Sequence, residues 1–145
     1  MQITDTLATL VSEALESAQA SGSLPAAGDV DIKIERPKLA EHGDFSTSLP
    51  LALARSMRMA PIQIAEAIAE AMPENEIVGA VTHAAPGFVN FTLSTTWLQA
   101  QIDVVRSAGD NFGSVTTGAG QSVQVEFVSV NPTGPLHVGH ARGAV

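Results

Sequence analysis

The sequence predicts an α+β fold class: a small antiparallel sheet with helices on one face, followed by the first strand, loop and helix of a second domain. Two observations predict the first domain. Apolar residues recur at helical spacing in four segments and alternate with polar residues in three others. The third observation is a strongly apolar segment near the end of the chain that runs into a Pro- and Gly-rich loop. Because this segment cannot form a core alone, it predicts a second domain.

The first helix and the first strand are predicted near the start of the chain. Residues 3–20 carry apolar side chains at helical spacing, and Gly22 follows them, where glycine commonly ends a helix. Apolar and polar residues alternate over 30–35, which predicts a strand that Pro37 limits. Residues 37–44 then read as a loop.

Two further helices are predicted in the middle of the chain. One runs from about residue 46 to 59 and accommodates Pro50 only in its first turn. The next begins near Pro61 and is ended by Pro73. Its predicted buried stripe comprises Ile64, Ala65, Ile68, Ala69 and Met72.

A hairpin and a fourth helix complete the first domain. Residues 77–84 and 88–93 predict two strands, and Ala85-Pro86-Gly87 between them is turn chemistry. Ser94-Thr95-Thr96 offers a cap for a helix over 97–108, and a glycine stops that helix.

The predicted domain boundary falls in the linker Gly113–Gly120, so that 1–117 form one domain and 118–145 begin another. Residues 123–128 predict a strand of the second domain. The chain stops at Val145 within a predicted helix, so we expect the second domain to be truncated.

Composition restricts the class of protein. Hydrophobic residues make up 45% and charged residues 15% of the chain, which is typical of a soluble globular protein. The absence of cysteine excludes disulfides and thiolate metal sites. There is no basic secretory signal and no apolar run near the roughly 20 residues of a membrane helix, so we expect a cytoplasmic protein with no membrane partner.

The net charge of −8 argues against nucleic-acid binding by bulk electrostatics. The charges are unevenly distributed, however, because five of the seven basic residues and only three acidic ones fall between positions 33 and 58. This window is either a basic surface or a chance cluster on a solvated face.

The run from Pro132 to His140 carries the strongest chemical signal. A strand enters a stiff loop and leaves it into a helix that starts at Leu136-His137, and a helix N-terminus attracts anions. His137 and His140 share one helix face and can donate hydrogen bonds to phosphate oxygens. Gly139 leaves backbone open to a flat ligand such as adenine. The arrangement suits ATP whose α-phosphate is attacked by a carboxylate.

Other interpretations of these histidines remain. A bare His-x-x-His is common by chance, and a zinc pair needs further ligands, of which only Glu126 is near. We therefore expect no metal site. The run has neither the Gly-Lys-Ser/Thr of a P-loop nor the G-x-G-x-x-G of a dinucleotide site.

The whole run resembles the HIGH signature of class I aminoacyl-tRNA synthetases, here His137-Val138-Gly139-His140. The preceding Val125–Asn131 resembles the arginyl-tRNA synthetase family, whereas glutamyl enzymes place a similar core near the chain start. Val130 replaces the family's usual Ala, and Val138 the usual Ile. Three upstream segments are similar to successive landmarks of the family's amino-terminal additional domain: Glu41–Phe45, Ala60–Ala65 and Pro86–Phe91.

This resemblance implies an arginine–tRNA ligase that activates arginine with ATP and transfers it to its tRNA. Residues 118–145 would begin its Rossmann-like catalytic domain, with ATP as substrate, Mg²⁺ accompanying it, and a monomeric full-length enzyme. His137 and His140 match catalytic positions, and Glu126 matches a carboxylate that faces the arginine guanidinium. The implied ATP contacts are Pro132, Thr133, Gly134, His137, Gly139 and His140, and the implied arginine contacts are Glu126, Ser129 and Asn131.

The resemblance also implies that the amino-terminal domain binds the D-loop region at the tRNA elbow. Phe88 and Asn90 match the residues that engage a base there, and positions two apart on a strand point the same way. Alternatively, Phe88 belongs to the hairpin core and Asn90 is a polar residue near the turn. We interpret His42-Gly43-Asp44 as a structural turn, with Asp44 near a helix start.

Two other functions compete. One is a nucleotidylyltransferase with H-x-G-H, although such enzymes place that motif close to the chain start. The other is a stand-alone RNA- or protein-binding module. We expect no turnover from these 145 residues alone, because the Lys-rich second class I signature is missing from them.

Overall fold

The computed structural model describes residues 2–28, 30–116, 118–126, 129, 131 and 133–142. The chain divides into two compact units, residues 1–109 and 110–145. The predicted domain boundary at 117/118 stays a prediction. In the first unit the helices are α1 (Ile3–Ala20), α2 (Leu49–Met57), α3 (Pro61–Glu70) and α4 (Thr95–Ala108), and the strands are β1 (Phe45–Thr47), β2 (Val78–Ala84) and β3 (Phe88–Leu93).

The three strands form one antiparallel sheet in the order β1-β3-β2. β2 and β3 make the predicted hairpin, with Ala84 opposite Phe88. β1 pairs with the other edge of β3, with Phe45 opposite Phe91 and Ser46 opposite Asn90. Side chains alternate across a strand, so Val89 and Phe91 face one side of the sheet and Phe88 and Asn90 the other.

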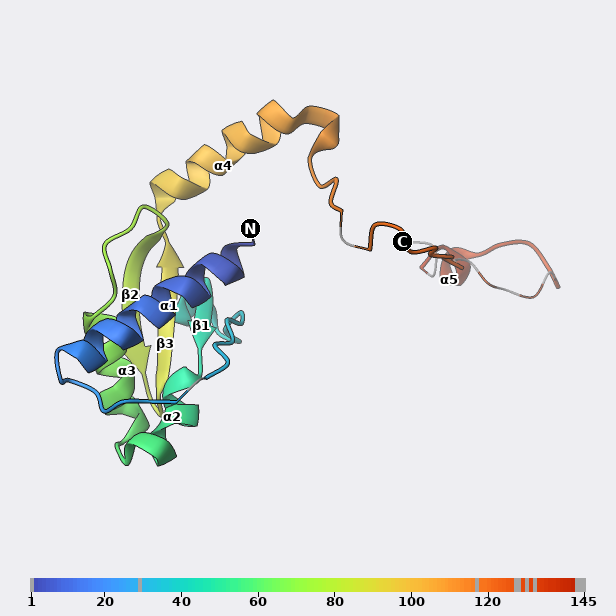
Figure 1. The fold of residues 1–145 in the computed structure, drawn as a ribbon. Helices are drawn as coiled ribbons and strands as arrows, with labels where there is room; N and C mark the ends of the chain where they lie inside the picture. Colours follow the sequence, from blue (N-terminus) through green and yellow to red (C-terminus); the bar gives the residue numbers. More distant parts are fainter. Residues whose placement is uncertain are drawn as a thin grey trace. The chain divides into compact units, whose positions relative to one another are not determined.

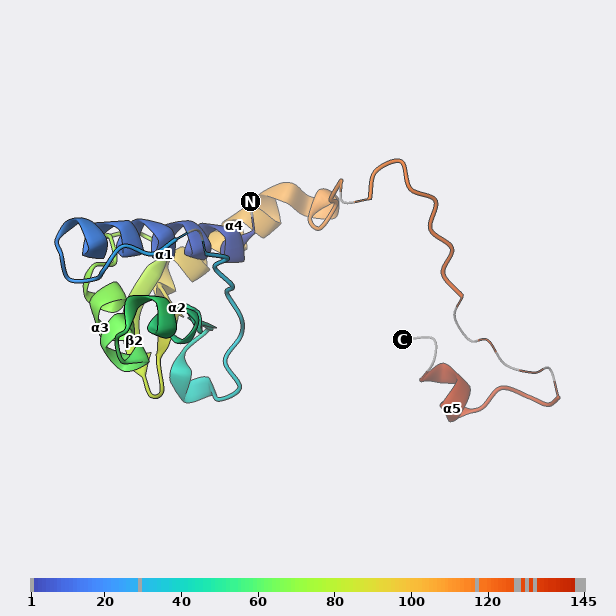
Figure 2. The same ribbon diagram turned by 60° about the horizontal axis from the view of Figure 1, so that its bottom comes forward.

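The core lies between one face of the sheet and α1, α2 and α3 (Figures 1 and 2). α3 contacts β2 and β3, α2 contacts β3, and α1 packs on α3. Val89 and Phe91 of the central strand are fully buried, as are Ile64 and Ile68 of α3 and Leu7 of α1. The predicted α+β arrangement with helices over a small antiparallel sheet is therefore confirmed for this unit.

Local signals placed most helices correctly. α1 has the predicted bounds, and Ile64, Ala65 and Ile68 form the buried stripe of α3. Pro50 lies in the first turn of α2. The Ser94 hydroxyl caps α4 by accepting from the Trp97 N–H at 3.4 Å. None of the described helices has the length and apolarity needed to cross a bilayer.

Two predicted elements are wrong. Residues 30–34 form no strand, and only Glu35 makes an isolated bridge, with Ser46. Their alternation reflects half-buried Val30, Ile32 and Ile34, which pack against the core without a neighbouring strand to bond. The helix predicted over 46–59 begins only at Leu49, because residues 45–47 pair with β3 instead.

The second unit contains α5 (Val138–Ala141), which begins beside the predicted helix start. No strand forms over the described residues 121–126, and Phe127 and Val128 of the predicted strand lie outside the described residues. A strand requires a neighbour to complete its hydrogen bonds, so an apolar segment alone does not suffice.

Candidate functional site

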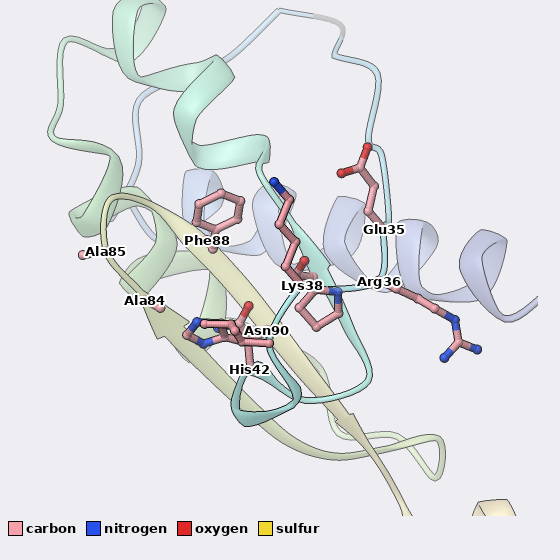
Figure 3. Close-up of a pocket in the computed structure, with 11 residues that line it drawn as sticks. Glu35, Arg36, Lys38, His42, Ala84, Ala85, Phe88 and Asn90 are labelled. Atoms are coloured by element: carbon pink, nitrogen blue, oxygen red, sulfur yellow. The ribbon is translucent and has the colours of Figure 1, made fainter.

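A cavity of about 400 Å³ opens on the face of the sheet opposite the helices. One wall is the tip of the β2–β3 hairpin, with Ala84 of β2, Ala85 of the turn, and Phe88 and Asn90 of β3. The other wall is the segment 35–39 together with His42 and Ser46. Figure 3 shows Phe88 and Asn90 along β3, with Lys38 and His42 beside them.

Phe88 and Asn90 line this cavity together, as expected for positions two apart on a strand. Phe88 is half-buried, and Asn90 is only 4% exposed. Within the described residues no group hydrogen bonds the Asn90 amide, and the amide is not among the polar atoms sealed from solvent. The cavity is therefore where this amide can find a partner, and Phe88 contributes to the same cavity wall.

The wall 35–42 is fixed to the sheet at both ends. At Glu35 the backbone N–H and C=O bond those of Ser46 at 2.9 and 2.8 Å. At the other end the Asp44 N–H donates to the Phe91 carbonyl at 2.8 Å, and the Asp44 Oδ2 accepts from the Leu93 N–H at 2.8 Å. His42 is half-buried in the cavity wall, and Gly43 has a φ of +82°.

The predicted structural turn at 42–44 is thus confirmed for Gly43 and Asp44, but Asp44 precedes β1 rather than a helix. His42 is also a lining residue, which the sequence interpretation did not include.

The cavity has a different charge from the rest of the chain. Arg36 and Lys38 line it with one carboxylate, Glu35, whereas the whole chain carries −8. No ion pair involves Arg36 or Lys38 within the part of the chain that the structure describes, while Lys33 pairs with Asp31 at 3.8 Å. The Arg36 guanidinium lies 5.2 Å from the centre of the Phe45 ring and points outward from the cavity (Figure 3).

This arrangement suits one kind of ligand. An aromatic wall accepts a flat ring, an amide bonds the edge of that ring, and cations at the rim attract a phosphate. An unpaired nucleotide combines these three features. Sequence reasoning found Phe88 and Asn90 but not Arg36, Lys38, His42 or Ser46 as lining residues. The clustering of basic residues between 33 and 58 was the available signal for the two cations.

The predicted catalytic residues lie in the second unit. Glu126 and Ser129 are brought together, since the Ser129 hydroxyl donates to the Glu126 Oε1. Asn131, Thr133 and Gly134 are exposed, and the Thr133 N–H donates to the Asn131 carbonyl at 2.8 Å. Pro132 lies outside the described residues.

His137 and His140 lie side by side, with ring centres 3.8 Å apart, but His137 is the extended N-cap residue of α5 and only His140 lies in the helix. The Gly139 N–H donates to Nδ1 of His137 at 3.1 Å, and the His137 N–H donates to Nδ1 of His140 at 3.2 Å. A neutral imidazole that accepts at Nδ1 carries its proton on Nε2, so both rings can donate outward through Nε2. A Cβ on Gly139 would lie 2.9 Å from Cε1 of His137, so the His137 ring occupies the space that we expected to be open to a flat ligand.

Comparison with known proteins supports the resemblance over most of the chain. The family model described as the arginyl tRNA synthetase N terminal domain matches residues 5–93. The arginine–tRNA ligase of Dehalococcoides mccartyi is 42% identical over 135 residues, which are 93% of this chain and 24% of that protein. The enzyme of Oceanobacillus iheyensis is 53% identical over 115 residues, or 79% of this chain and 21% of that protein.

Solved structures give a similar result. The arginyl-tRNA synthetase of Thermus thermophilus has a TM-score of 0.55 and 25% identity, over 98% of this chain and 21% of that one. The Plasmodium falciparum enzyme has a TM-score of 0.55 at 16% identity, over 69% of this chain and 17% of that one, and shows likeness of fold. The chain spans about a quarter of the length of the curated relatives that it matches.

Proposed function

The chain belongs to the arginyl-tRNA synthetase family, and we propose that residues 1–117 form a domain that binds the D-loop region at the elbow of arginine tRNA. The observation that carries the proposal is the cavity shared by Phe88 and Asn90. Phe88 stacks on an unpaired base, and the free amide of Asn90 bonds the edge of that base. Lys38, which lines the cavity, attracts the adjoining phosphate, and Arg36, whose guanidinium points outward over Phe45, adds positive charge outside the cavity.

We further propose that the whole protein is an arginine–tRNA ligase, monomeric and cytoplasmic, in which residues 118–145 begin a Rossmann-like catalytic domain. There the segment 123–128 gains neighbouring strands, which supply the strand pairing that residues 123–126 do not have in this structure. Such sheets bind ligands at the carboxyl ends of their strands, where the loop 129–137 would follow.

In that setting the arginine carboxylate attacks the α-phosphate of ATP, pyrophosphate leaves and arginyl-adenylate forms. A hydroxyl at the 3′ end of the tRNA then attacks the arginyl carbonyl, and AMP leaves. His137 and His140 donate through Nε2 to phosphate oxygens as negative charge develops. Thr133 and Gly134, with Pro132, contact ATP, which arrives with Mg²⁺; the contact of Gly139 with ATP requires the His137 ring to turn away from the glycine. Glu126 holds the arginine guanidinium, and Ser129 and Asn131 hold its other polar atoms.

A titration tests RNA recognition directly. We expect the 145-residue chain to bind an arginine tRNA transcript more tightly than an unrelated RNA hairpin of equal length, because the cavity engages an unpaired base as well as phosphates. Fluorescence anisotropy at several salt concentrations measures both affinities. Equal affinity for the two RNAs at every salt concentration would exclude specific recognition.

Removing the rim cations should weaken binding without changing which RNA is preferred. For Arg36→Ala/Lys38→Ala we expect lower affinity for both RNAs and a slope of log K against log salt shallower by about 0.7 for each phosphate that is no longer neutralised. The control is Lys33→Ala/Arg106→Ala, which removes the same charge from two residues that already have carboxylate partners and lie outside the cavity. A control slope as shallow as that of the rim variant would assign the effect to net charge alone.

The chain should catalyse no ATP–pyrophosphate exchange by itself. It spans about a quarter of the length of its relatives, and Thr133, Gly134 and His137 are exposed to solvent. An exchange assay with arginine and labelled pyrophosphate measures this. Turnover above the no-enzyme rate would show that 118–145 already complete an active site.

A further inference from the structure

We propose that Ser46 is a second base-reading residue of the cavity, acting together with Asn90. This inference rests on the proposed function, because it assigns a specificity-determining role within the same site. Residues 46 and 90 lie directly opposite each other on β1 and β3, and both line the cavity.

The backbone pairing brings the two side chains close together. Ser46 directs both its N–H and its C=O to Glu35, away from β3. Ser46 and Asn90 therefore form a non-hydrogen-bonded pair of the antiparallel ladder, the type in which facing Cα atoms are only about 4.5 Å apart and side chains are nearest. Both side chains leave the sheet on the same face, opposite the core residues Val89 and Phe91.

Both side chains are also buried without an internal partner. Ser46 is 7% exposed and Asn90 is 4% exposed. Among the described residues no hydrogen bond involves the Ser46 hydroxyl or the Asn90 amide, yet neither group is sealed from the cavity. The neighbouring Thr47 shows the contrast, because its hydroxyl faces the core and accepts from the Leu49 N–H at 3.2 Å.

Buried polar groups nearly always have partners, so two unpartnered groups side by side indicate a place for a polar ligand. The hydroxyl can donate or accept, and the amide does both. Together they present fixed hydrogen-bonding positions to the edge of one base, below the ring that stacks on Phe88. A base whose edge does not match leaves a buried group unpaired, and this discriminates between bases more strongly than one amide alone does.

The test measures base discrimination rather than affinity alone. Arginine tRNA transcripts carrying each of the four bases at the unpaired positions of the elbow identify the base that the unmodified chain prefers. For Ser46→Ala we expect affinity for the preferred RNA to fall about three- to ten-fold, the effect of one neutral hydrogen bond, with affinity for the other bases nearly unchanged. The matched control is Thr82→Ala, which removes an exposed hydroxyl opposite Asn90 on β2, outside the cavity. This control should retain the full preference.

A double-mutant cycle adds a second readout. If Ser46 and Asn90 read the same base, Ser46→Ala should change discrimination less in an Asn90→Ala background than in the unmodified chain. Unchanged base preference in Ser46→Ala, or an equal loss for all four bases, would overturn the proposal. Both results differ from failure of the proposed function, in which the unmodified chain does not distinguish arginine tRNA from the unrelated hairpin.

Discussion

Phe88→Ala should weaken binding of arginine tRNA about ten- to a hundred-fold, since stacking of one base on an aromatic side chain contributes about 1–3 kcal/mol. Among the described residues that line the cavity, Phe88 carries the only phenyl ring, and His42 contributes a smaller imidazole ring. Its ring is half-buried, so removing it also costs some packing. Binding should therefore be measured by anisotropy at a temperature where thermal unfolding monitored by circular dichroism shows the variant fully folded.

The matched control for this substitution is Phe112→Ala. Phe112 is 57% exposed and does not line the cavity, so its loss removes the same ring from a surface without the proposed role. We expect its tRNA affinity to stay within about two-fold of the unmodified chain. Similar losses in the two variants, or an unchanged affinity in Phe88→Ala, would contradict stacking at this position.

Gly43→Ala should be among the most destabilising single changes in the first unit, at about 3 kcal/mol or more. Gly43 has φ +82° and ψ −158°, a region that only glycine commonly adopts. A Cβ there would also lie 2.6 Å from the Phe91 carbonyl oxygen. That oxygen accepts the Asp44 N–H, and it belongs to the fully buried central strand, so it cannot move without disturbing β3.

Gly22→Ala separates the cost of the positive-φ backbone conformation from the cost of the close contact with the Phe91 carbonyl. Gly22 also has a positive φ, +81°, but a Cβ there meets no atom within 4 Å. We expect it to cost only about 1 kcal/mol, the penalty of the backbone conformation alone. Thermal unfolding of the two variants compares these costs, because a change of 1 kcal/mol in the free energy of unfolding shifts the Tm by about 4–8 °C in a domain of this size. Equal shifts would mean that the close approach of residue 43 to β3 contributes nothing.

The cavity also depends on the close approach of Gly43 to β3. Gly43 connects His42, in the cavity wall, to Asp44, whose carboxylate accepts from the Leu93 N–H. The close packing of this turn on β3 therefore holds the wall 35–42 over Phe88 and Asn90.

Local sequence signals determined those elements that form from neighbouring residues. Helical spacing and end signals predicted α1 and α3, and the Ala85-Pro86-Gly87 turn predicted the β2–β3 hairpin. The positions of Phe88 and Asn90 on one face of β3 followed from strand periodicity. The motif residues also pointed to the family that the comparisons then showed.

Tertiary structure decided what depends on partners distant in the chain. Residues 45–47 became β1 because Phe45 pairs with Phe91, whereas residues 30–34 alternate in the same way as a strand but have no neighbouring strand to bond. Lys38, Ser46 and Asn90 likewise line the same cavity, and no local sequence pattern predicts that these residues lie close together. Periodicity records which side of a segment is buried, but hydrogen-bond pairing and the walls of a cavity require a second segment, whose position only the folded chain specifies.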